Sequence, residues 1–284
     1  AYKFNAGGGV GQANWVELIE LPDDYRGEFK RNDPKRAEKF GNLVDSAISN
    51  LTAKQIGLAG FIAETFPSVA GQIIPPEGYL QNVYKHIRNA GGLCVADEVQ
   101  TGLGRLGKFY FGFEQQGVEP DIVILGKPIG NGHPIGVVIT SSEIAESFAQ
   151  GPEFFSTFGG STLSCLIGKE VLEIIDEEKL QNNASLMGKK LLNGLSKLQD
   201  NFSQIGDVRG LGLFCGVDLV KNRETREEDP DLCSYIKNRM RDHRILMGSE
   251  GPKDNVLKIR PPLTIDEEGI DMILSCLQKI MQEI

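Results

Sequence analysis

Apolar and polar positions along the first hundred residues alternate between a helical period and short continuous apolar runs. Apolar residues spaced three and four apart predict amphipathic helices, and apolar runs of four to seven residues between turn signals predict strands. The elements predicted in this part are helices at 33–50 and 79–90 and strands at 15–21, 57–63 and 93–96. Because strands and helices alternate, the pattern favours an α/β fold with a mostly parallel sheet.

The pattern continues through two more apolar runs and then becomes mainly helical. A long amphipathic stretch at residues 164–198, which we expect to break near Asn182 and Asn183, would lead from a large domain to a smaller one. The other predicted elements are strands at 122–125 and 135–139, helices at 143–149, 231–242 and 265–284, and strands on either side of 231–242. We therefore predict a large domain over residues 1–175 and a connecting helix with a C-terminal small α/β domain over 176–284.

Composition narrows the classes of function. A net charge of -9 and a pI near 5.0 argue against binding to nucleic acid, which usually requires a basic face. The five cysteines are odd in number and form no CxxC pair, and the three histidines lack metal-ligand spacing, so we predict neither disulfides nor a metal site. No apolar run is long enough to cross a membrane. These features predict a cytoplasmic protein.

Candidate chemistry lies in two apolar runs that end in glycine-rich loops, CVADEVQTGLGRLG (residues 94–107) and DIVILGKPIGNGHP (residues 121–134). They place a carboxylate, Asp97, and an amine, Lys127, at the ends of two predicted strands. A lysine can condense with an aldehyde cofactor, and a carboxylate can keep a pyridine nitrogen protonated. The alternative is that Asp97 and Lys127 form only a salt bridge. Glu64 also ends a predicted strand, and such ends meet at one edge of a parallel sheet.

Four segments carry a resemblance to a known family: DEVQTGLGR, LGKPIGNGHP, FSTFGGSTLSC (residues 155–165) and GDVRGLGLFCGVDLV (residues 206–220). They resemble the class-III aminotransferases, pyridoxal-phosphate enzymes of fold type I. Other segments resemble the phospho-lyases that act on phosphoethanolamine and 5-phosphohydroxylysine: DDYRGEF, FIAETFPSVAGQIIPPEGY and MGSEGPKDNVLKIRPPL. The family has a large domain with a mostly parallel sheet and a smaller C-terminal α/β domain. Because the chain begins with Ala1 and the resemblance starts partway into the family's length, we interpret it as a C-terminal fragment.

The resemblance implies roles for individual residues. Lys127 would bind the pyridoxal 5'-phosphate aldehyde, and Asp97 would face its ring nitrogen. Val99 would lie under the ring, although plain core packing is the alternative, and Gln100 would lie beside the 3-hydroxyl. Thr157 would reach the cofactor phosphate of a neighbouring subunit, which implies a homodimer with shared active sites; an ordinary loop hydroxyl is the alternative.

Two further residues are implied in substrate binding. Arg260 lies where class-III transaminases place an arginine that binds a substrate carboxylate, whereas the phospho-lyases tend to have lysine there. Glu64 matches the glutamate that can hold this arginine as a gate; a fixed ion pair is the alternative. His133, next to the lysine, we interpret as a turn residue rather than as a general base.

The resulting hypothesis is a phospho-lyase that eliminates phosphate from an amino-alkyl phosphate such as phosphoethanolamine. The first alternative is a transaminase that moves an amino group from an amine or omega-amino acid to a 2-oxo acid. The second is a catalytically silent module of a larger fusion protein. The expected partner is a small-molecule amine, with neither nucleic acid nor membrane involved.

Overall fold

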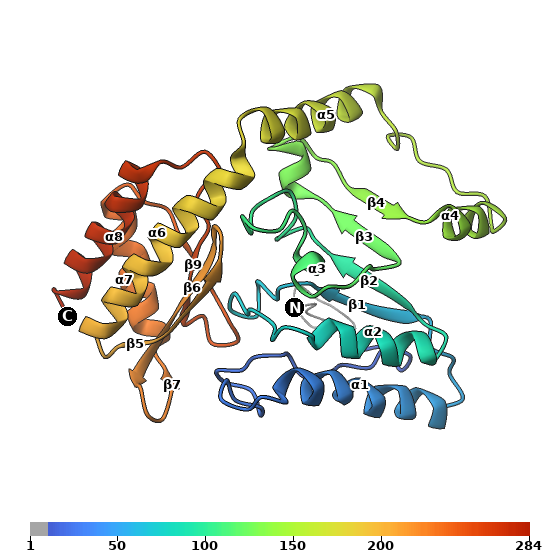
Figure 1. Ribbon diagram of the computed structural model, residues 1–284, viewed down its shortest axis with the longest axis horizontal. Helices are drawn as coiled ribbons and strands as arrows, with labels where there is room; N and C mark the ends of the chain where they lie inside the picture. Colours follow the sequence, from blue (N-terminus) through green and yellow to red (C-terminus); the bar gives the residue numbers. More distant parts are fainter. Residues whose placement is uncertain (1–10) are drawn as a thin grey trace.

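The computed structural model describes residues 11–284, which form two sheets joined by two long helices (Figure 1). The first sheet has the strand order β1-β2-β3-β4. Strands β1, β2 and β3 are parallel, and β4 is antiparallel to β3. The bounds are β1 Gly60–Glu64, β2 Leu93–Asp97, β3 Ile122–Leu125 and β4 Val137–Thr140. The mostly parallel α/β architecture predicted from the sequence is confirmed.

Helices α1 (Arg36–Ala53) and α2 (Tyr79–Asn89) lie side by side and pack on the first sheet (Figure 1). Their apolar residues share one buried cluster that includes Phe40, Val83 and Cys94. Helix α2 ends where predicted, because Gly91 adopts a left-handed backbone with φ of 81° that only glycine adopts without cost. A short helix, α3 (Gly112–Gln115), follows β2.

One prediction for this part of the chain was wrong. The expected strand at residues 15–21 is not a strand, because its backbone joins no ladder among the described residues; it covers α1 and the edge of β1 instead. Strand β4 continues this sheet as expected, and it is the one strand of the described sheet that runs antiparallel to its neighbour, β3. A parallel crossover requires a dozen or more residues, usually with a helix, whereas the connection between β3 and β4, residues 126–136, contains only the short 3-10 turn Lys127–Gly130.

The helices α5 (Thr162–Glu177) and α6 (Leu180–Asn201) connect the two sheets, after the short α4 (Ser142–Ala149). The predicted break near Asn182 and Asn183 is present, and it lies slightly earlier in the chain, at Lys179, whose φ is 53°. Asn183 lies inside α6, and its amide donates to the carbonyls of Leu263 (2.7 Å) and Ile265 (2.8 Å). That asparagine thus anchors the helix to a distant loop, and the domain boundary at 175–176 stays a prediction.

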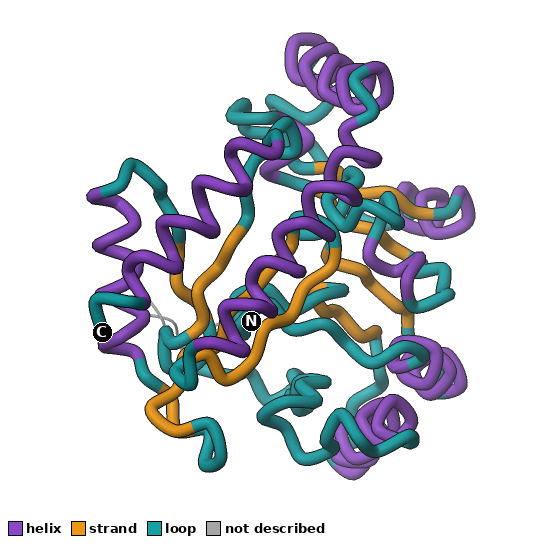
Figure 2. The backbone as a smooth tube through the Cα atoms, turned by 60° about the vertical axis from the view of Figure 1, so that its left-hand side comes forward, coloured by secondary structure: helices purple, strands orange, loops and turns teal. Residues whose placement is uncertain are grey.

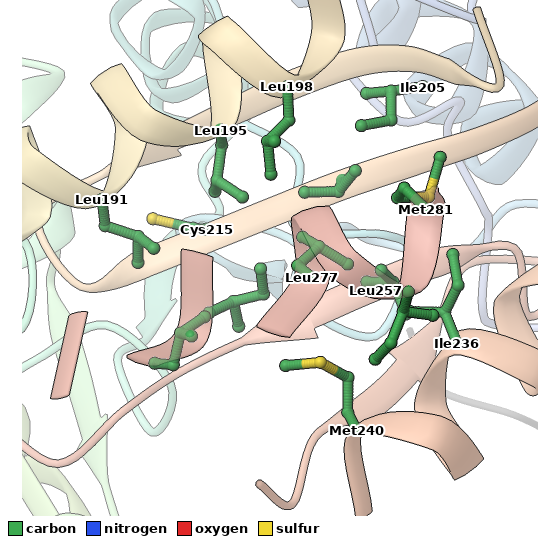
Figure 3. Close-up of a cluster of buried hydrophobic side chains, with 14 of the residues drawn as sticks. Leu191, Leu195, Leu198, Ile205, Cys215, Ile236, Met240, Leu257, Leu277 and Met281 are labelled. Carbon is green, nitrogen blue, oxygen red and sulfur yellow. The ribbon is translucent and has the colours of Figure 1, made fainter. Parts of the chain in front are cut away.

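The second sheet is antiparallel, with the order β5-β6-β9-β8, and β7 pairs with the end of β6. Three helices cover one of its faces (Figure 2). The bounds are β5 Ile205–Leu211, β6 Phe214–Asn222, β7 Glu227–Glu228, α7 Pro230–Asp242, β8 Gly248–Glu250, β9 Val256–Ile259 and α8 Glu267–Met281. Side chains of α6, α7 and α8 meet alternate residues of β6 in the largest apolar core described (Figure 3).

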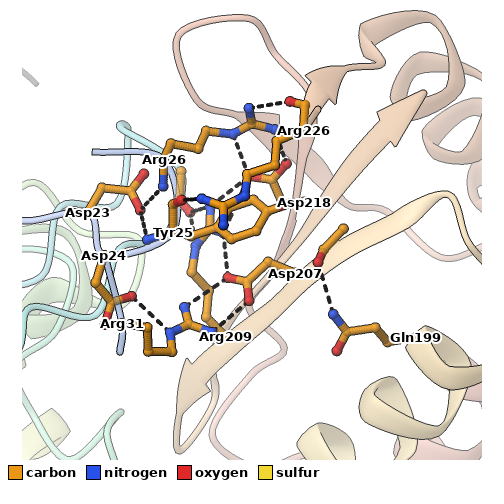
Figure 4. Close-up of polar contacts among 12 residues, drawn as sticks. Asp23, Asp24, Tyr25, Arg26, Arg31, Gln199, Asp207, Arg209, Asp218 and Arg226 are labelled. Carbon is orange, nitrogen blue, oxygen red and sulfur yellow. Dashed lines mark hydrogen bonds and ion pairs between the residues drawn. The ribbon is translucent and has the colours of Figure 1, made fainter. Parts of the chain in front are cut away.

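The opposite face of this sheet carries a buried network of arginines and aspartates (Figure 4). Asp218 of β6 is fully buried and accepts hydrogen bonds from Arg26 (2.6 Å) and Arg209 (3.2 Å). Asp207 of β5 pairs with Arg209 (3.0 Å) and with Arg31 (2.9 Å). Arg209 also donates twice to the carbonyl of Gly71. The network therefore fastens residues 23–31 and the loop after β1 to the second sheet.

This network predicts acid-labile stability. Burial alone would raise the pKa of Asp207, but its hydrogen bonds and ion pairs with Arg31 and Arg209 outweigh burial and lower that pKa below its ordinary value of 3.8. A lowered carboxyl pKa stabilises the folded state fully above 3.8, and that stabilisation is lost as the pH falls below 3.8. We expect urea unfolding to show a free-energy difference between wild type and Asp207→Asn that is constant near neutrality and shrinks below that pH. A difference independent of pH would contradict this assignment.

Candidate active site

Three of the predicted site residues meet at the carboxyl edge of the first sheet. Glu64 ends β1 and lies in register with Asp97, which ends β2. Asp97 lies in register with Ile124 of β3, and Lys127 follows the end of that strand by two residues. The backbone N–H of Thr65 also donates to the carbonyl of Asp97 (3.2 Å). The parallel sheet therefore brings two carboxylates and an amine to one edge, as the sequence predicted.

Lys127 lies exposed at the first position of the short 3-10 turn after β3. Its φ of 33° is unusual for a residue other than glycine, and such backbone conformations cluster at functional sites. The preceding residue, Gly126, lies against Val99, because a Cβ on Gly126 would be 3.4 Å from Cγ2 of that valine. Val99 therefore lies next to the start of the Lys127 turn.

The loop after β2 places Asp97 and Gln100 close to each other in a tight turn. Asp97 accepts a hydrogen bond from the backbone N–H of Val99 (3.0 Å), the local contact by which aspartate stabilises turns. The backbone N–H groups of Thr101 and Gly102 both donate to the carbonyl of Glu98 (3.3 and 2.9 Å). These bonds hold the carboxylate of Asp97 at the strand end.

Arg260 contacts Gln100 and does not form the expected ion pair with Glu64. Its Nη1 donates to the side-chain oxygen of Gln100, and its Nη2 donates to the carbonyl of that residue (2.5 Å). Glu64 instead accepts the backbone N–H of Ser68 (2.8 Å), and burial raises the pKa of Glu64. The two oxygens of Gln100 occupy the guanidinium fork that would bind a carboxylate, so the Glu64–Arg260 ion pair is not formed in this structure and the gate stays a prediction.

Arg260 is nevertheless an incompletely partnered cation. Its Nε is buried without a hydrogen-bond partner. Burial and the neighbouring Arg105 lower the pKa of Arg260 to about 9, and the negative charges of Glu64 and Glu250 offset only part of this effect. Arg105 is itself buried and donates to the carbonyls of Leu213 and Pro261. Two buried guanidinium groups near each other favour the approach of an anion.

Thr157 is not brought to this edge of the sheet. It lies in the exposed segment between α4 and α5, at the far end of the first sheet from α6, α7 and α8 (Figure 1). His133, near Lys127 in sequence, has its Nε2 2.9 Å from the hydroxyl of Ser164 at the start of α5. That contact agrees with its interpretation as a turn residue.

Sequence reasoning missed two charged residues that adjoin the site, Glu98 and Arg105. Both are in the glycine-rich loop DEVQTGLGR, and Glu98 is only 1% exposed while Arg105 reaches the second sheet. A charge inside a glycine-rich loop is the signal that could have identified them, because a buried charge requires partners or a function. Among residues 11–284 there is no group of three or more His, Cys, Asp and Glu side chains placed to hold a metal ion.

The donor set at this edge fits the cofactor implied by the resemblance. A pyridine ring that carries a phosphate and an aldehyde needs an amine for the aldehyde, a carboxylate for the ring nitrogen and an apolar surface for the ring. Lys127, Asp97 and Val99 supply these groups from adjacent strand ends. The Nε of Arg260, which is buried without a hydrogen-bond partner, is a further N–H donor near this edge.

Comparison with known proteins agrees with this chemistry. The family model described as aminotransferase class-III matches residues 13–281. The chain is 45% identical over 292 residues to the protein of Drosophila melanogaster named alanine–glyoxylate aminotransferase 2-like, covering 99% of this chain and 59% of that protein. It is 38% identical to ethanolamine-phosphate phospho-lyase homolog 1 of Caenorhabditis elegans, covering 99% of this chain and 62% of that one. The chain thus spans about three fifths of the length of these relatives.

A solved structure is similar over nearly the whole chain. It is a phospholyase from Arthrobacter in complex with phosphoethanolamine, with a TM-score of 0.90 and 36% sequence identity. The alignment covers 95% of this chain and 64% of that structure.

Proposed function

The chain belongs to the class-III aminotransferase family, and from this premise we propose that the protein eliminates phosphate from an amino-alkyl phosphate such as phosphoethanolamine. Pyridoxal 5'-phosphate is the cofactor of this family. The observation that carries the proposal is the meeting of Lys127 and Asp97 at one sheet edge, with the fork of Arg260 occupied by Gln100. An arginine held in this way is not presented to a substrate α-carboxylate, and phosphoethanolamine has none.

The proposed roles follow from the position of each side chain. When bound, pyridoxal phosphate supplies an electron sink for the carbon that bears the substrate amine. Lys127 would remove a proton from that carbon, because its amine lies exposed beside the turn that leads out of β3. Asp97 would hold the proton on the ring nitrogen, and Val99 would pack against the ring. Gln100, held by Arg260, would orient the ring hydroxyl.

The net reaction is balanced by one water molecule. Phosphoethanolamine and water give acetaldehyde, ammonia and inorganic phosphate. The carbon that bears the amine loses a proton, and the C–O bond on the adjacent carbon breaks with its electron pair leaving on phosphate. The phosphate dianion needs a positive potential nearby, and the neighbouring guanidinium groups of Arg105 and Arg260 supply one.

The resemblance to the Drosophila relative named an aminotransferase supports the alternative, amino-group transfer to a 2-oxo acid. Phosphorus NMR of the protein with pyridoxal phosphate and phosphoethanolamine separates the two. Release of inorganic phosphate without a 2-oxo acid supports the lyase, and consumption of the amine only when a 2-oxo acid is present supports the transaminase. A failure of pyridoxal phosphate to bind would favour the third hypothesis, a catalytically silent module.

We propose that the protein is a homodimer and that the segment from β4 to the start of α5, the apolar arm, lies in the subunit interface. Side chains in this arm are unusually exposed for apolar residues, and contiguous apolar surface of this kind marks interaction sites. They are Val138, Phe148, Phe154, Phe155, Phe158, Leu163 and Leu166. In such a dimer Thr157 would reach the site of the partner subunit.

Mutations in the apolar arm are expected to change the mass of the protein in solution from that of a dimer to that of a single chain. Phe155 is 80% exposed and Phe158 is 84% exposed in a single chain, so burying both in a dimer would contribute about 3–6 kcal/mol. We expect wild type to have the mass of two chains in light scattering and the double variant Phe155→Ser, Phe158→Ser to have the mass of one. Leu246→Ser removes an equally exposed residue outside the arm and should leave the dimer intact. A dimer that survives the double variant would contradict the assignment.

Among the described residues no helix is long and apolar enough to cross a membrane. The cytoplasmic location stays a prediction.

A further inference from the structure

Glu98 is a buried carboxylate next to the proposed site, and no role has yet been assigned to it. We propose that Glu98 is a positioning residue, which holds the three strand ends that carry Glu64, Asp97 and Lys127 in one arrangement. This proposal rests on the proposed function, because the arrangement matters for the cofactor site at Lys127.

The first observation is the number of donors that converge on this side chain. Oε1 accepts hydrogen bonds from the hydroxyl of Thr65 (2.8 Å) and from the backbone N–H of Phe113 (3.0 Å). Oε2 accepts them from the hydroxyl of Thr101 (2.5 Å) and from the backbone N–H of Gly112 (2.9 Å). No described ion pair involves Glu98, so these four donors are what solvates the carboxylate.

Four donors on two oxygens match an ionised carboxylate, which only accepts hydrogen bonds. Burial by itself raises the pKa of Glu98, and the four hydrogen bonds act in the opposite direction. When one of these donors moves away, the buried carboxylate loses a hydrogen bond, and leaving it without that partner costs free energy. Glu98 therefore opposes the displacement of every segment that donates to it.

The second observation is which segments supply those donors. Thr65 directly follows Glu64 at the end of β1, and Thr101 directly follows Gln100 in the loop after β2. The backbone N–H of Glu98 donates to the carbonyl of Ile124 in β3 (2.9 Å), three residues before Lys127. The side chain of Glu98 thus contacts the residues that follow β1 and the loop that follows β2, and its backbone contacts the third parallel strand, β3.

The third observation is the direction in which the side chain of Glu98 points. Glu98 directly follows the last residue of β2, and its carboxylate is directed at the hydroxyl of Thr65 and at the backbone of Gly112 and Phe113. The side chain of Glu98 is 1% exposed, and Gly112 and Phe113 at the start of α3 cover it. It therefore acts on the site through its neighbours and touches neither substrate nor cofactor.

Glycine at position 112 is part of this arrangement. A Cβ there would lie 3.1 Å from Oε1 of Glu98 and 2.9 Å from the methyl group of Thr65. The backbone of α3 can therefore approach the carboxylate closely enough to donate two N–H groups only because this residue has no side chain.

The test compares Glu98→Gln with the single-donor variants Thr65→Val and Thr101→Val. The glutamine keeps the size of the side chain but replaces an acceptor by an N–H₂ donor, which leaves a donor such as the N–H of Gly112 without a partner. We expect a tenfold to hundredfold fall in kcat, the scale of about 1 Å of misplacement, with a smaller change in KM. The circular dichroism of the bound cofactor per mole should fall, and its dissociation constant should rise about tenfold.

Glu114→Gln is the matched control. Glu114 is a neighbouring glutamate in α3 that accepts the backbone N–H of Tyr110 (3.1 Å), and it contacts none of the three strand ends. It should leave kcat and the cofactor spectrum unchanged. If Glu98→Gln does not fold, the two threonine variants carry the test, because each removes one hydroxyl and leaves the carboxylate in place.

The outcomes separate this proposal from the proposed function. If borohydride reduction attaches the cofactor to Lys127 in wild type, and all three variants keep its spectrum, affinity and kcat while only their melting temperatures fall, Glu98 is purely structural and the proposal is wrong. If wild type shows no attachment at Lys127, the proposed function fails and this proposal fails with it. Attachment in wild type with a weakened, spectrally altered site in the variants supports both.

Discussion

Replacing Lys127 by alanine is expected to reduce turnover of an amine substrate by at least about three orders of magnitude, because the amine serves both as cofactor anchor and as proton carrier. The side chain of Lys127 is exposed and no hydrogen bond or ion pair of it is described, so its removal should leave the fold unchanged. The φ of 33° at this position is equally unfavourable for lysine and for alanine, so the substitution should not change the backbone strain. The loss should therefore fall on the chemistry and not on stability.

The measurement combines steady-state kinetics with mapping of the attached cofactor. Wild type is mixed with pyridoxal phosphate and reduced with borohydride, and peptide mass spectrometry locates the added mass, which we expect only at Lys127. Lys189→Ala, which removes an exposed lysine on α6, serves as the control and should retain both labelling and turnover. Residual turnover within tenfold of wild type in Lys127→Ala would remove this lysine from the mechanism.

Asp218→Ala should cause the largest loss of stability of any single substitution in the buried network. Asp218 is fully buried and accepts hydrogen bonds from Arg26, Arg209 and Asn255 (2.8 Å for the last). Without the aspartate, the buried Arg209 keeps only Asp207 as an anionic partner. Removing one partner of a buried ion pair typically costs about 3–5 kcal/mol, because an uncompensated charge remains in the interior.

Urea unfolding of wild type and Asp218→Ala measures this loss as a shift of the midpoint at similar slope. Lys221→Ala is the matched control on the same strand, because its ion pair with Glu227 is exposed to solvent, where such pairs contribute little. We expect no measurable change for that variant. An equal loss in both variants would mean that burial of the network is not what makes Asp218 important.

Much of the fold was predictable because its elements follow from local patterns. Helix α2 ends at Gly91 as the sequence indicated, since a left-handed residue is required there and glycine supplies it. The direction of β4 was not predictable from its apolar run, because a short strand reads the same in both directions; the length of the connection after Lys127 decides it. The break between α5 and α6 was predictable only approximately, because Asn183, a poor helix former, lies inside α6 and makes a tertiary contact.

The residues of the site also divide into those that a local sequence pattern predicts and those that only the folded structure reveals. Asp97 and Lys127 could be predicted because each lies at the end of an apolar strand, where a charged side chain is costly unless it has a partner or a function. The contact of Arg260 with Gln100 joins residues 160 positions apart, and no local pattern contains the distance between two loops of different sheets. Likewise, the four partners of Glu98 come from residues 65, 101, 112 and 113, which only the packed sheet brings together.

The sequence by itself determined the family, the succession of strands and helices, and the residues able to bind an aldehyde and a ring nitrogen. These properties depend on residue type and spacing, which the chain carries whether or not it is folded. The tertiary structure decided which groups face each other: Arg260 with Gln100 rather than Glu64, and the Glu98 carboxylate with Thr65, Thr101 and the start of α3. A hydrogen bond depends on distances of about 3 Å, and over long sequence separations only the packing of the whole fold sets such distances.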